Sequence, residues 1–496
     1  MSTGGESQAA GAQATTTEFD AGNLLDQVVA ATRPQDESEA GRAKDYFKQF
    51  IGSIVQPGQV ISRDVETSIK NWIGEIDKKL SAQLNEVMHA PEFQKLEGTW
   101  RGLNYLVNQS ETGESLKIRV LNVSKRELFK DLERAAEFDQ SSLFKRIYEE
   151  EYGQLGGKPF GMLVGDYEFS RTAEDVALLK MISGVAAASH APFVANASAK
   201  MFNMDSFTDL AKPRDLAKVF DSVEYAAWKS FRESDDSRYA ALAMPRVLAR
   251  LPYGPDFKTV EEFNFVETVD GKNHDKYAWM GAAWAYAARI TDAYSQYGWM
   301  ARTRGVEGGG KVEGLPVHTF PTDDGDVAMK CPTEVAISDR REFELSNLGF
   351  MPLIHIKDSD FAAFIGAQSC QKPKAYFDPA ANANAELSAK FNLILNTSRF
   401  AHYLKVMARD KIGSMMEVGE ASAWLNNWIQ NYVVPTPSMV GEATKAEKPL
   451  SDARVDVREV KGKPGSYEAV AYLKPHYQLE TLSTSMRLVA EVPKQA

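Results

Sequence analysis

The chain has 496 residues, of which 44% are hydrophobic and 25% are charged, a composition typical of a globular protein with two or three domains. Its formal net charge of -11 argues against a general polyanion binder, because phosphate backbones are held by clustered Lys and Arg. We therefore expect no nucleic-acid partner. The two cysteines, Cys331 and Cys370, are too few for a disulfide framework and lack C-x-x-C spacing, so both are expected to be buried thiols in a reducing compartment.

The N-terminal 45 residues are expected to form a mobile tail. Residues 1–18 are mainly Gly, Ala, Ser, Thr and Gln, which offer little surface to bury. The chain does not begin with a basic stretch followed by an apolar one, so we expect no classical signal peptide, no direct insertion into a membrane and a cytoplasmic location.

A short apolar helix is expected inside this tail, in the stretch FDAGNLLDQVVAATRP at 19–34. Asn23 suits the N-cap position, and Pro34 ends the helix. A helix of this length is not stable alone in water, where roughly 12 to 15 residues are marginal. It therefore has to dock, either on its own chain or on a partner. The side chains that share its apolar face are Leu24, Leu25, Val28 and Val29.

The segment from 46 to 107 is expected to be helical, because its apolar residues recur at spacings of three and four. The stretch LKIRVLNV at 116–123 alternates apolar and basic residues, which predicts a strand with one covered face. Ser124 and Glu127 stand in capping-box register, so a helix is expected to start directly after that strand. In the first segment, the recurring apolar residues include Ile69, Trp72, Ile73, Ile76 and Leu80.

A strand, a helix and a second strand are expected between residues 160 and 197. The strands are FGMLVGDYEF and PFVANA, and Thr172 with Asp175 caps the helix at 173–191 between them. Because both strands are apolar, their sheet should be covered on both faces. The predicted fold class is α/β, with mixed α+β character: sheet layers covered by helices, a helical N-terminal layer, and C-terminal strands available for pairing between subunits.

The remaining segments continue this mixture of helices and strands. Residues 274–297 predict a buried helix, because small and aromatic side chains lie on most sides of it. Residues 383–416 predict a long amphipathic helix or a helix pair. A strand at the end of a chain has an unpaired edge unless something covers it. The other expected elements are a helix at 421–433 and strands at 352–356, 453–460, 467–473 and 486–492.

The stretch GVEGGGKV at 305–312 satisfies the spacing G-x-x-x-x-G-K, but Val312 replaces the Ser or Thr that would bind Mg²⁺, and Pro316 prevents a following helix. We interpret it as a flexible glycine loop, and a nucleotide-binding cytoplasmic enzyme that uses this loop is the alternative function. No other motif indicates a catalytic residue or a cofactor. No metal site is expected either, since metal-ligand spacing is missing among His89, His190, His274, His318, His355, His402 and His476.

Two clusters of mixed charge are candidates for contacts with a protein partner. One lies in SDRREFEL and the other in VMARDKIGS. Such runs are usually a solvated face, but complementary charges also set register and specificity between proteins. The candidate residues are Asp339, Arg340, Arg341 and Glu342 in the first cluster and Arg409, Asp410 and Lys411 in the second.

Several long stretches, in order, carry a family resemblance. They include LEGTWRGLNYLV, GDYEF followed by AAASHAPFVANAS, SRYAALAMPRVLARLPYG and GGGKVEGLPVH. They continue with TEVAISDRREFELSNLGFMPLIHIKDSDFAAFIGAQSCQKPK, SRFAHYLKVMARDKIGS and HYQLETLSTSMRLVAEVP. In these stretches, and from about residue 24 to residue 492, the chain resembles the large subunit of the type VI secretion contractile sheath, the TssC or VipB family.

The resemblance implies a mechanical, non-enzymatic protein. Members of this family pair with a smaller subunit, TssB, and the pairs assemble with other TssC copies around an inner tube of Hcp, next to the baseplate. The sheath then shortens and drives the tube outward. Afterwards the AAA+ ATPase ClpV disassembles the contracted form.

The resemblance also assigns roles to the two ends of the chain. The tail helix, with Asn23 and its apolar face, is expected to be the element that ClpV recognises. The last strand is expected to pair with strands of neighbouring subunits, through the alternation of Met486, Leu488, Ala490 and Val492. The expected organisation is a mobile tail at 1–45, a main sheath region at 46–378 and a C-terminal region at 379–496 that ends in a strand-forming arm at 450–496, with the two folded regions free to interdigitate.

Overall fold

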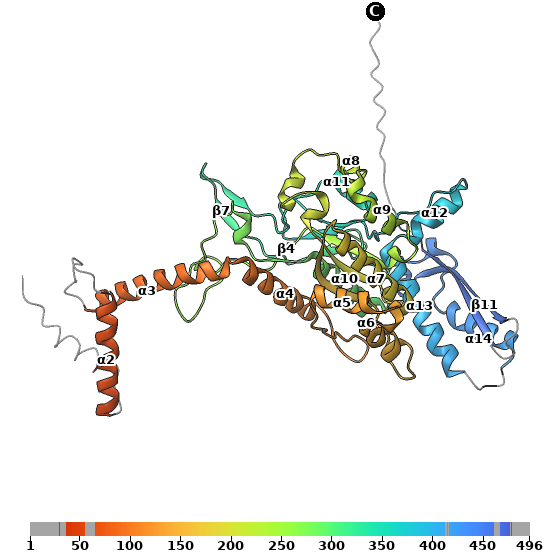
Figure 1. Cartoon of the computed structure of the whole chain (residues 1–496), viewed down its shortest axis with the longest axis horizontal. Helices are drawn as coiled ribbons and strands as arrows, with labels where there is room; N and C mark the ends of the chain where they lie inside the picture. Colours follow the sequence, from red (N-terminus) through yellow and green to blue (C-terminus); the bar gives the residue numbers. More distant parts are fainter. Residues whose placement is uncertain are drawn as a thin grey trace, which may run out of the picture. The chain divides into compact units, whose positions relative to one another are not determined.

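A computed structural model describes residues 29, 36–54, 65–411, 414, 416–460, 467–476 and 478 (Figure 1). The chain divides into two compact units, one of residues 1–86 and 253–267 and one of residues 87–252 and 268–496. No described helix is both long and apolar enough to cross a membrane. The helices are α2 (Glu37–Ile54), α3 (Val65–Met88), α4 (Pro91–Asn108), α5 (Lys125–Arg134), α6 (Ser142–Phe144), α7 (Ala173–Ser189), α8 (Leu216–Phe220), α9 (Ala226–Glu233), α10 (Ala282–Tyr297), α11 (Asp339–Asn347), α12 (Pro379–Ser388), α13 (Phe391–Asp410), α14 (Val418–Gln430) and α15 (Glu442–Glu447). The strands are β1 (Leu163–Phe169), β2 (Phe193–Ala197), β3 (Ala240–Met244), β4 (Val247–Leu248), β5 (Trp279–Met280), β6 (Lys311–Val312), β7 (Thr319–Pro321), β8 (Val327–Met329), β9 (Met351–His355), β10 (Ala362–Phe364), β11 (Leu450–Glu459) and β12 (Tyr467–Pro475).

The helical first unit contains α2 and most of α3, and within it α3 buries a polar side. Asp77 accepts a hydrogen bond from Asn264 Nδ2 at 3.3 Å, and Asn85 Nδ2 donates to the carbonyl oxygen of Val266 at 2.9 Å. On the predicted apolar face, Ile73 is 47% exposed and Leu80 is 44% exposed. The predicted helix is confirmed, but part of its apolar side is exposed, as is typical of a surface that another protein covers.

The centre of the second unit is a six-stranded sheet with the order β1-β2-β3-β9-β10-β6. The first four strands run parallel, and β10 and β6 complete the sheet with antiparallel pairing. Successive side chains of a strand point to opposite faces. On β2, Phe193 and Ala195 join the core that contains α7, whereas Val194 joins the core that contains α10. Helices therefore cover both faces of the sheet, and the predicted α/β class is confirmed.

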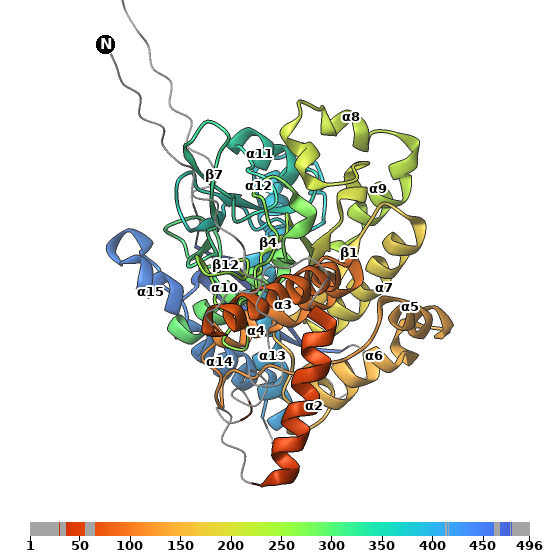
Figure 2. The same cartoon turned by 90° about the vertical axis from the view of Figure 1, so that its left-hand side faces the viewer.

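Two helices of this unit begin directly after the capping residues predicted from the sequence. The Ser124 hydroxyl accepts from the Glu127 amide at 3.2 Å, and the Glu127 carboxylate accepts from the Ser124 amide at 2.9 Å, so the capping box of α5 is complete. Thr172 caps α7 by accepting from the Asp175 amide at 3.4 Å. Both α5 and α9 contact α7, and all three helices can be followed in Figure 2. The predicted strand, helix and strand between 160 and 197 are β1, α7 and β2.

The strand predicted at 116–123 is wrong, because this segment forms no ladder with any described strand. Its alternation serves packing instead: Ile118 packs on the cluster around Leu106 of α4, while Arg119 forms an ion pair with Glu151. Val120, predicted to lie on the covered face, is 67% exposed. Period-two alternation thus marked an extended segment but not a hydrogen-bonded strand.

The helix predicted at 274–297 begins later, at Ala282. Residues 274–276 form a 3-10 turn, and Trp279 and Met280 form β5, which pairs with β4. Gly281 then occupies the N-cap, where a Cβ would lie 2.3 Å from Asn196 Nδ2. The pattern of small and aromatic residues indicates burial, which a short strand and a helix satisfy equally.

The two cysteines differ in burial, which corrects one of two predictions. Cys370 is fully buried, and burial raises the pKa of its thiol to about 12. Cys331 is only half-buried and lies 3.2 Å from the Thr333 hydroxyl. Both are free thiols, as expected.

Candidate assembly interface

The C-terminal region builds its own small core from α13, α14 and the β11–β12 hairpin (Figure 1). Trp299 stacks on Phe400 of α13 with ring centroids 4.2 Å apart. Leu425 and Ile429 of α14 are buried in the same core as Val455 of β11. The helix pair predicted at 383–416 corresponds to α12 and α13, and the helix predicted at 421–433 corresponds to α14.

The hairpin of β11 and β12 confirms the strands predicted at 453–460 and 467–473. The strands are antiparallel, with Val455 opposite Ala471, and neither joins the six-stranded sheet. Among the described residues, β12 pairs with β11 alone. An unpaired strand edge is a template for a strand from another chain. This hairpin is therefore the candidate interface for assembly.

Three polar side chains of α14 that sequence analysis missed lie against the backbone of β11. Ser422, Asn426 and Gln430 all bond to it. They stand four residues apart, so they form one polar stripe on a helix whose sequence, SAWLNNWIQ, is otherwise rich in aromatic residues. That spacing is the signal that could have identified them.

The first charged cluster divides into two pairs. Arg341 donates to Glu344 at 2.6 Å and to the carbonyl oxygen of Arg214 at 2.8 Å, so it ties α11 to its own unit. Glu342 accepts from the Ser346 hydroxyl at 2.8 Å, and burial raises the pKa of its carboxyl. Asp339 and Arg340 are exposed at the start of α11. Asp339 and Arg340 can therefore contact a partner protein without losing these contacts, whereas Arg341 and Glu342 cannot.

The second charged cluster ends α13. Arg409 is half-buried and donates to the carbonyl oxygen of Tyr152 at 3.4 Å, while the Lys411 ammonium lies 5.2 Å from the centre of the Trp424 ring. Asp410 is exposed. Arg409 is therefore held by its own chain, whereas Asp410 and Lys411 are both exposed at the surface.

Most of the terminal candidate residues lie outside the part of the chain that the structure describes. This applies to Asn23, Leu24, Leu25 and Val28 of the tail helix and to Met486, Leu488, Ala490 and Val492 of the last strand. Val29 is described, as a helical residue with a buried side chain. The roles of these residues stay predictions.

The glycine loop at 305–312 is folded onto its own chain. The Gly305 amide donates to the carbonyl oxygen of Phe364 at 2.7 Å, and a Cβ on Gly310 would lie 2.5 Å from the same oxygen. Lys311 belongs to β6 and bonds to Glu313 at 2.5 Å. The glycines thus allow close backbone packing, and the lysine that would meet a phosphate is paired with a carboxylate. No observation favours a nucleotide site here.

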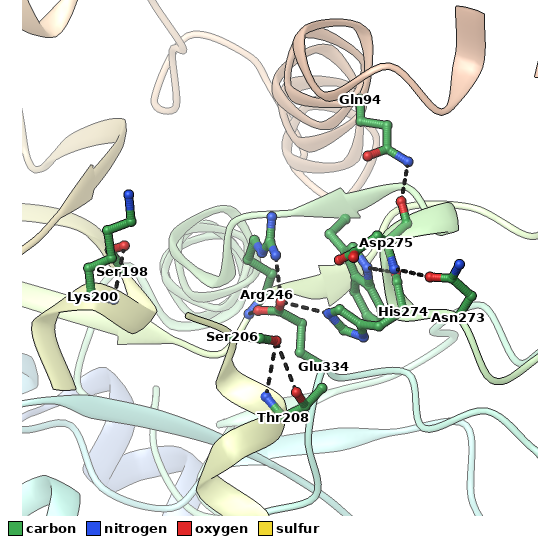
Figure 3. Close-up of polar contacts among 11 residues, drawn as sticks. Gln94, Ser198, Lys200, Ser206, Thr208, Arg246, Asn273, His274, Asp275 and Glu334 are labelled. Atoms are coloured by element: carbon green, nitrogen blue, oxygen red, sulfur yellow. Dashed lines mark hydrogen bonds and ion pairs between the residues drawn. The ribbon is translucent and has the colours of Figure 1, made fainter. Parts of the chain in front are cut away.

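Figure 3 includes a buried carboxylate, that of Glu334, which sequence analysis missed and which contacts both Arg246 and His274. Glu334 accepts from Arg246 Nη2 at 2.6 Å and from the Arg246 backbone amide at 2.9 Å, and its carboxylate lies 2.9 Å from His274 Nε2. Close by, Gln94 of α4 donates to the carbonyl oxygen of Asp275 at 2.6 Å. This cluster ties loops together. No described residues form a group of three or more His, Cys, Asp and Glu that could hold a metal ion.

Comparison with known families assigns the chain. The family model for VipB, described as EvpB/VC_A0108, tail sheath N-terminal domain, matches residues 70–371, and the model for the tail sheath gpW/gp25-like domain of the same family matches residues 380–492. The chain belongs to the TssC/VipB family of tail sheath proteins. Like other TssC/VipB proteins, it has a structural role, and its hairpin lies within the second matched domain.

The chain is similar to two known proteins. It is 51% identical over 484 residues to "Type VI secretion system sheath protein TssC1" of Pseudomonas aeruginosa, and the match covers 97% of each chain. A chain in the cryo-EM structure of the anti-feeding prophage (AFP) baseplate is 9% identical, with a TM-score of 0.33, over 64% of this chain and 66% of that one. The resemblance to the TssC/VipB family is thus confirmed by the first relative and by the family models.

Proposed function

We propose that this chain is the large subunit of a type VI secretion contractile sheath. In the cytoplasm it pairs with the smaller subunit TssB, and the pairs polymerise around a tube of Hcp that starts at the baseplate. The sheath contracts to drive the tube outward, and ClpV disassembles it afterwards. Because the energy is stored during assembly, the chain itself needs no catalytic residue.

The observation that carries this proposal is the edge of β12 that no other described strand occupies, in a chain of the sheath family. A sheath must keep its subunits linked while they rotate past one another. Strands exchanged through terminal arms provide such links, because the folded parts of two linked subunits can still move relative to each other. Residues 486–492 follow the hairpin with the alternation that such an added strand needs.

Exposed apolar surface supports the pairing with a smaller subunit. On α4, Gly98 and Gly102 are buried, whereas Leu96 is 55% exposed and Trp100 is 63% exposed on the opposite side of the helix. Apolar side chains grouped in this way are typical of surfaces that a partner covers. We expect the chain to behave poorly when it is produced without TssB.

Removing the last strand tests the role of the hairpin. The chain lacking residues 480–496, co-expressed with its small subunit, should still form a soluble pair but no tubules in negative-stain electron microscopy. A chain lacking residues 2–18 is the control, since this segment offers little to bury and its loss should leave tubules intact. Normal tubules from the C-terminal truncation would refute the proposal for this strand.

The tail helix is proposed as the element that ClpV recognises. Leu25→Asp combined with Val28→Asp should leave assembly and contraction intact while contracted sheaths persist, because burying two carboxylates against an apolar partner surface is unfavourable. Val29, which the sequence places on the same face, is buried, so we expect its side chain to be released when ClpV binds.

The control for this variant is Gln27→Asp, which adds a charge to the other side of the same helix. It should leave ClpV binding unchanged, as measured by pull-down with purified contracted sheaths. Equal ClpV binding by the double variant and the native chain would exclude this role.

A further inference from the structure

The half-buried thiol of Cys331 lies against a histidine from a different part of the chain. Cys331 follows strand β8, and its thiol is hydrogen-bonded to the imidazole of His355, the last residue of β9. Both residues are partly exposed, so the contact between them is open to solvent. The two side chains therefore form a cysteine–histidine pair at the surface.

The backbone fixes which nitrogen of His355 faces the thiol. His355 Nε2 lies 2.9 Å from the carbonyl oxygen of Ser359, in the turn between β9 and β10. A carbonyl oxygen only accepts hydrogen bonds, so Nε2 carries a hydrogen. The turn is itself held by the Ser359 hydroxyl, which donates to the carbonyl oxygen of Ile356 at 2.6 Å. Nδ1 is thus the nitrogen left for the thiol, and in the neutral ring it is a base.

Other groups around the sulfur favour its ionised form. The Thr333 amide donates a hydrogen bond to the sulfur, and the ammonium of Lys330 is close enough to interact with the charge of the thiolate. The carboxylate of Asp358 favours the charged form of the His355 ring. Once the proton has moved from sulfur to Nδ1, the thiolate faces an imidazolium, an amide hydrogen and an ammonium, which is the kind of environment that makes a cysteine reactive.

The pKa values of the two thiols separate them. Burial opposes ionisation of Cys331, but the hydrogen bonds from His355 and Thr333, together with the charge of His355, outweigh burial and lower the pKa of this thiol. Burial of His355 is outweighed in the same way by its hydrogen bond to Cys331, so the pKa of the imidazole is raised. Cys370 is fully buried, and its pKa is raised to about 12. Since the thiolate is the nucleophile, the two cysteines should differ strongly in reactivity at neutral pH.

We propose that Cys331 is a site of reversible disulfide exchange with low-molecular-weight disulfides, with His355 as the base that accepts its proton. The thiolate attacks one sulfur of the disulfide, so that a new S–S bond joins Cys331 to one half of the molecule while the original S–S bond breaks. The other half leaves as a thiolate and takes the proton from His355. Cys331 is thereby oxidised and the leaving half is reduced, and an excess of free thiol reverses the exchange. The site goes beyond the proposed sheath function and does not rest on it.

Modification of the native protein is the first test. The full chain, purified in complex with its small subunit, is incubated with glutathione disulfide and analysed by mass spectrometry of the intact chain and of its peptides. We expect one adduct on this chain, at Cys331 and not at Cys370, and its complete removal by dithiothreitol. Modification of Cys370 at an equal or higher rate, the absence of an adduct, or chains linked to each other by disulfides in place of the adduct would overturn the proposal.

The variant His355→Gln tests the role of the imidazole. Glutamine offers an amide hydrogen to the Ser359 carbonyl in place of Nε2, but it provides no base for the thiol. With an aromatic disulfide whose released thiol absorbs visible light, the rate at Cys331 should fall about threefold or more at pH 7, because the loss of thiolate outweighs the greater nucleophilicity of a more basic thiol. The midpoint of the pH–rate profile should move to higher pH. An unchanged or faster rate would overturn the proposal, since a loosened loop only exposes the thiol further.

Two further variants are controls. Cys331→Ser should abolish the reaction. His476→Gln is the matched histidine control, because His476 Nε2 also lies 2.9 Å from a carbonyl oxygen, that of Lys448, and its loss should leave the rate at Cys331 unchanged. Thermal unfolding checks that His355→Gln is folded. If it is not, the pH–rate profile of the native chain decides: a midpoint at or above that of free cysteine would overturn the proposal.

Discussion

At the scale of single residues, the buried carboxylate of Glu334 shows how tightly one charge is held. Burial opposes its ionisation, but the hydrogen bond from His274 and the charge and hydrogen bond of Arg246 outweigh that effect and lower the pKa from 4.5 to about 2. Arg246 is itself partly exposed, with 38% of its side chain accessible, so water screens part of this attraction.

The pKa of Glu334 predicts a pH dependence of stability. A carboxyl whose pKa is lowered by folding contributes stability above its unfolded pKa, and this contribution is lost as the pH falls through the folded pKa. The window therefore runs from about pH 4.5 down to about pH 2. Over it, the free energy of unfolding should fall by about 3 kcal/mol on account of this group alone.

The variant Glu334→Gln isolates this contribution. It should lower the free energy of unfolding at pH 7 by about 2–3 kcal/mol, because Arg246 loses its charged partner. The gap between the variant and the native chain, measured by urea unfolding of the complex with the small subunit, should shrink as the pH approaches 3. A gap that is the same at both pH values would contradict the lowered pKa.

At the scale of elements, α4 is fixed by two glycines that the sequence places one helical turn apart. A Cβ on Gly98 would lie 2.2 Å from the carbonyl oxygen of Trp279, and a Cβ on Gly102 would lie 2.2 Å from the Trp284 ring. Glycine is unfavourable inside a helix by roughly 1 kcal/mol relative to alanine. Its presence at both positions is explained by the close approach of α4 to β5 and α10, since nothing larger fits.

The substitution Gly98→Ala tests this packing. Despite the better helix propensity of alanine, it should lower the midpoint of thermal unfolding, because the contact is with backbone that cannot rotate away. Gly184→Ala in α7 is the matched control: no atom lies within 4 Å of its Cβ position, so the gain in propensity, roughly 0.5–1 kcal/mol, should appear as a higher midpoint. A higher midpoint for both variants would contradict the close approach.

The helices and strands also show where sequence patterns were ambiguous. The capping signals at Ser124 and Thr172 predicted helix starts correctly, because a cap is satisfied by residues three positions away. The alternation at 116–123 predicted a strand that does not form, since a ladder depends on a partner that no local pattern reports. Local interactions were thus predictable, and pairing between distant segments was not.

At the scale of the whole molecule, the amino-acid sequence was sufficient for the fold class and the family. Apolar strands flanked by capped helices require a sheet covered on both faces, whatever the order in which the strands are arranged in that sheet. Long family stretches in order indicated a sheath protein, and the match over 97% of the chain agrees. Both conclusions depend on patterns that repeat along the chain. They therefore hold even where the prediction of a single helix or strand is wrong.

The tertiary structure alone decided which strand edges are open and which polar groups are paired. The spacing of Ser422, Asn426 and Gln430 indicated a polar stripe but not that the stripe lies against β11. Nothing in the order of residues indicated that Glu334 is held by Arg246 and His274, or that α3 buries a polar side. Each of these facts depends on segments that are distant in sequence or on a rotation of one helix about its axis. A hydrogen bond or a buried charge is set by positions in space, which one-dimensional periodicity does not specify.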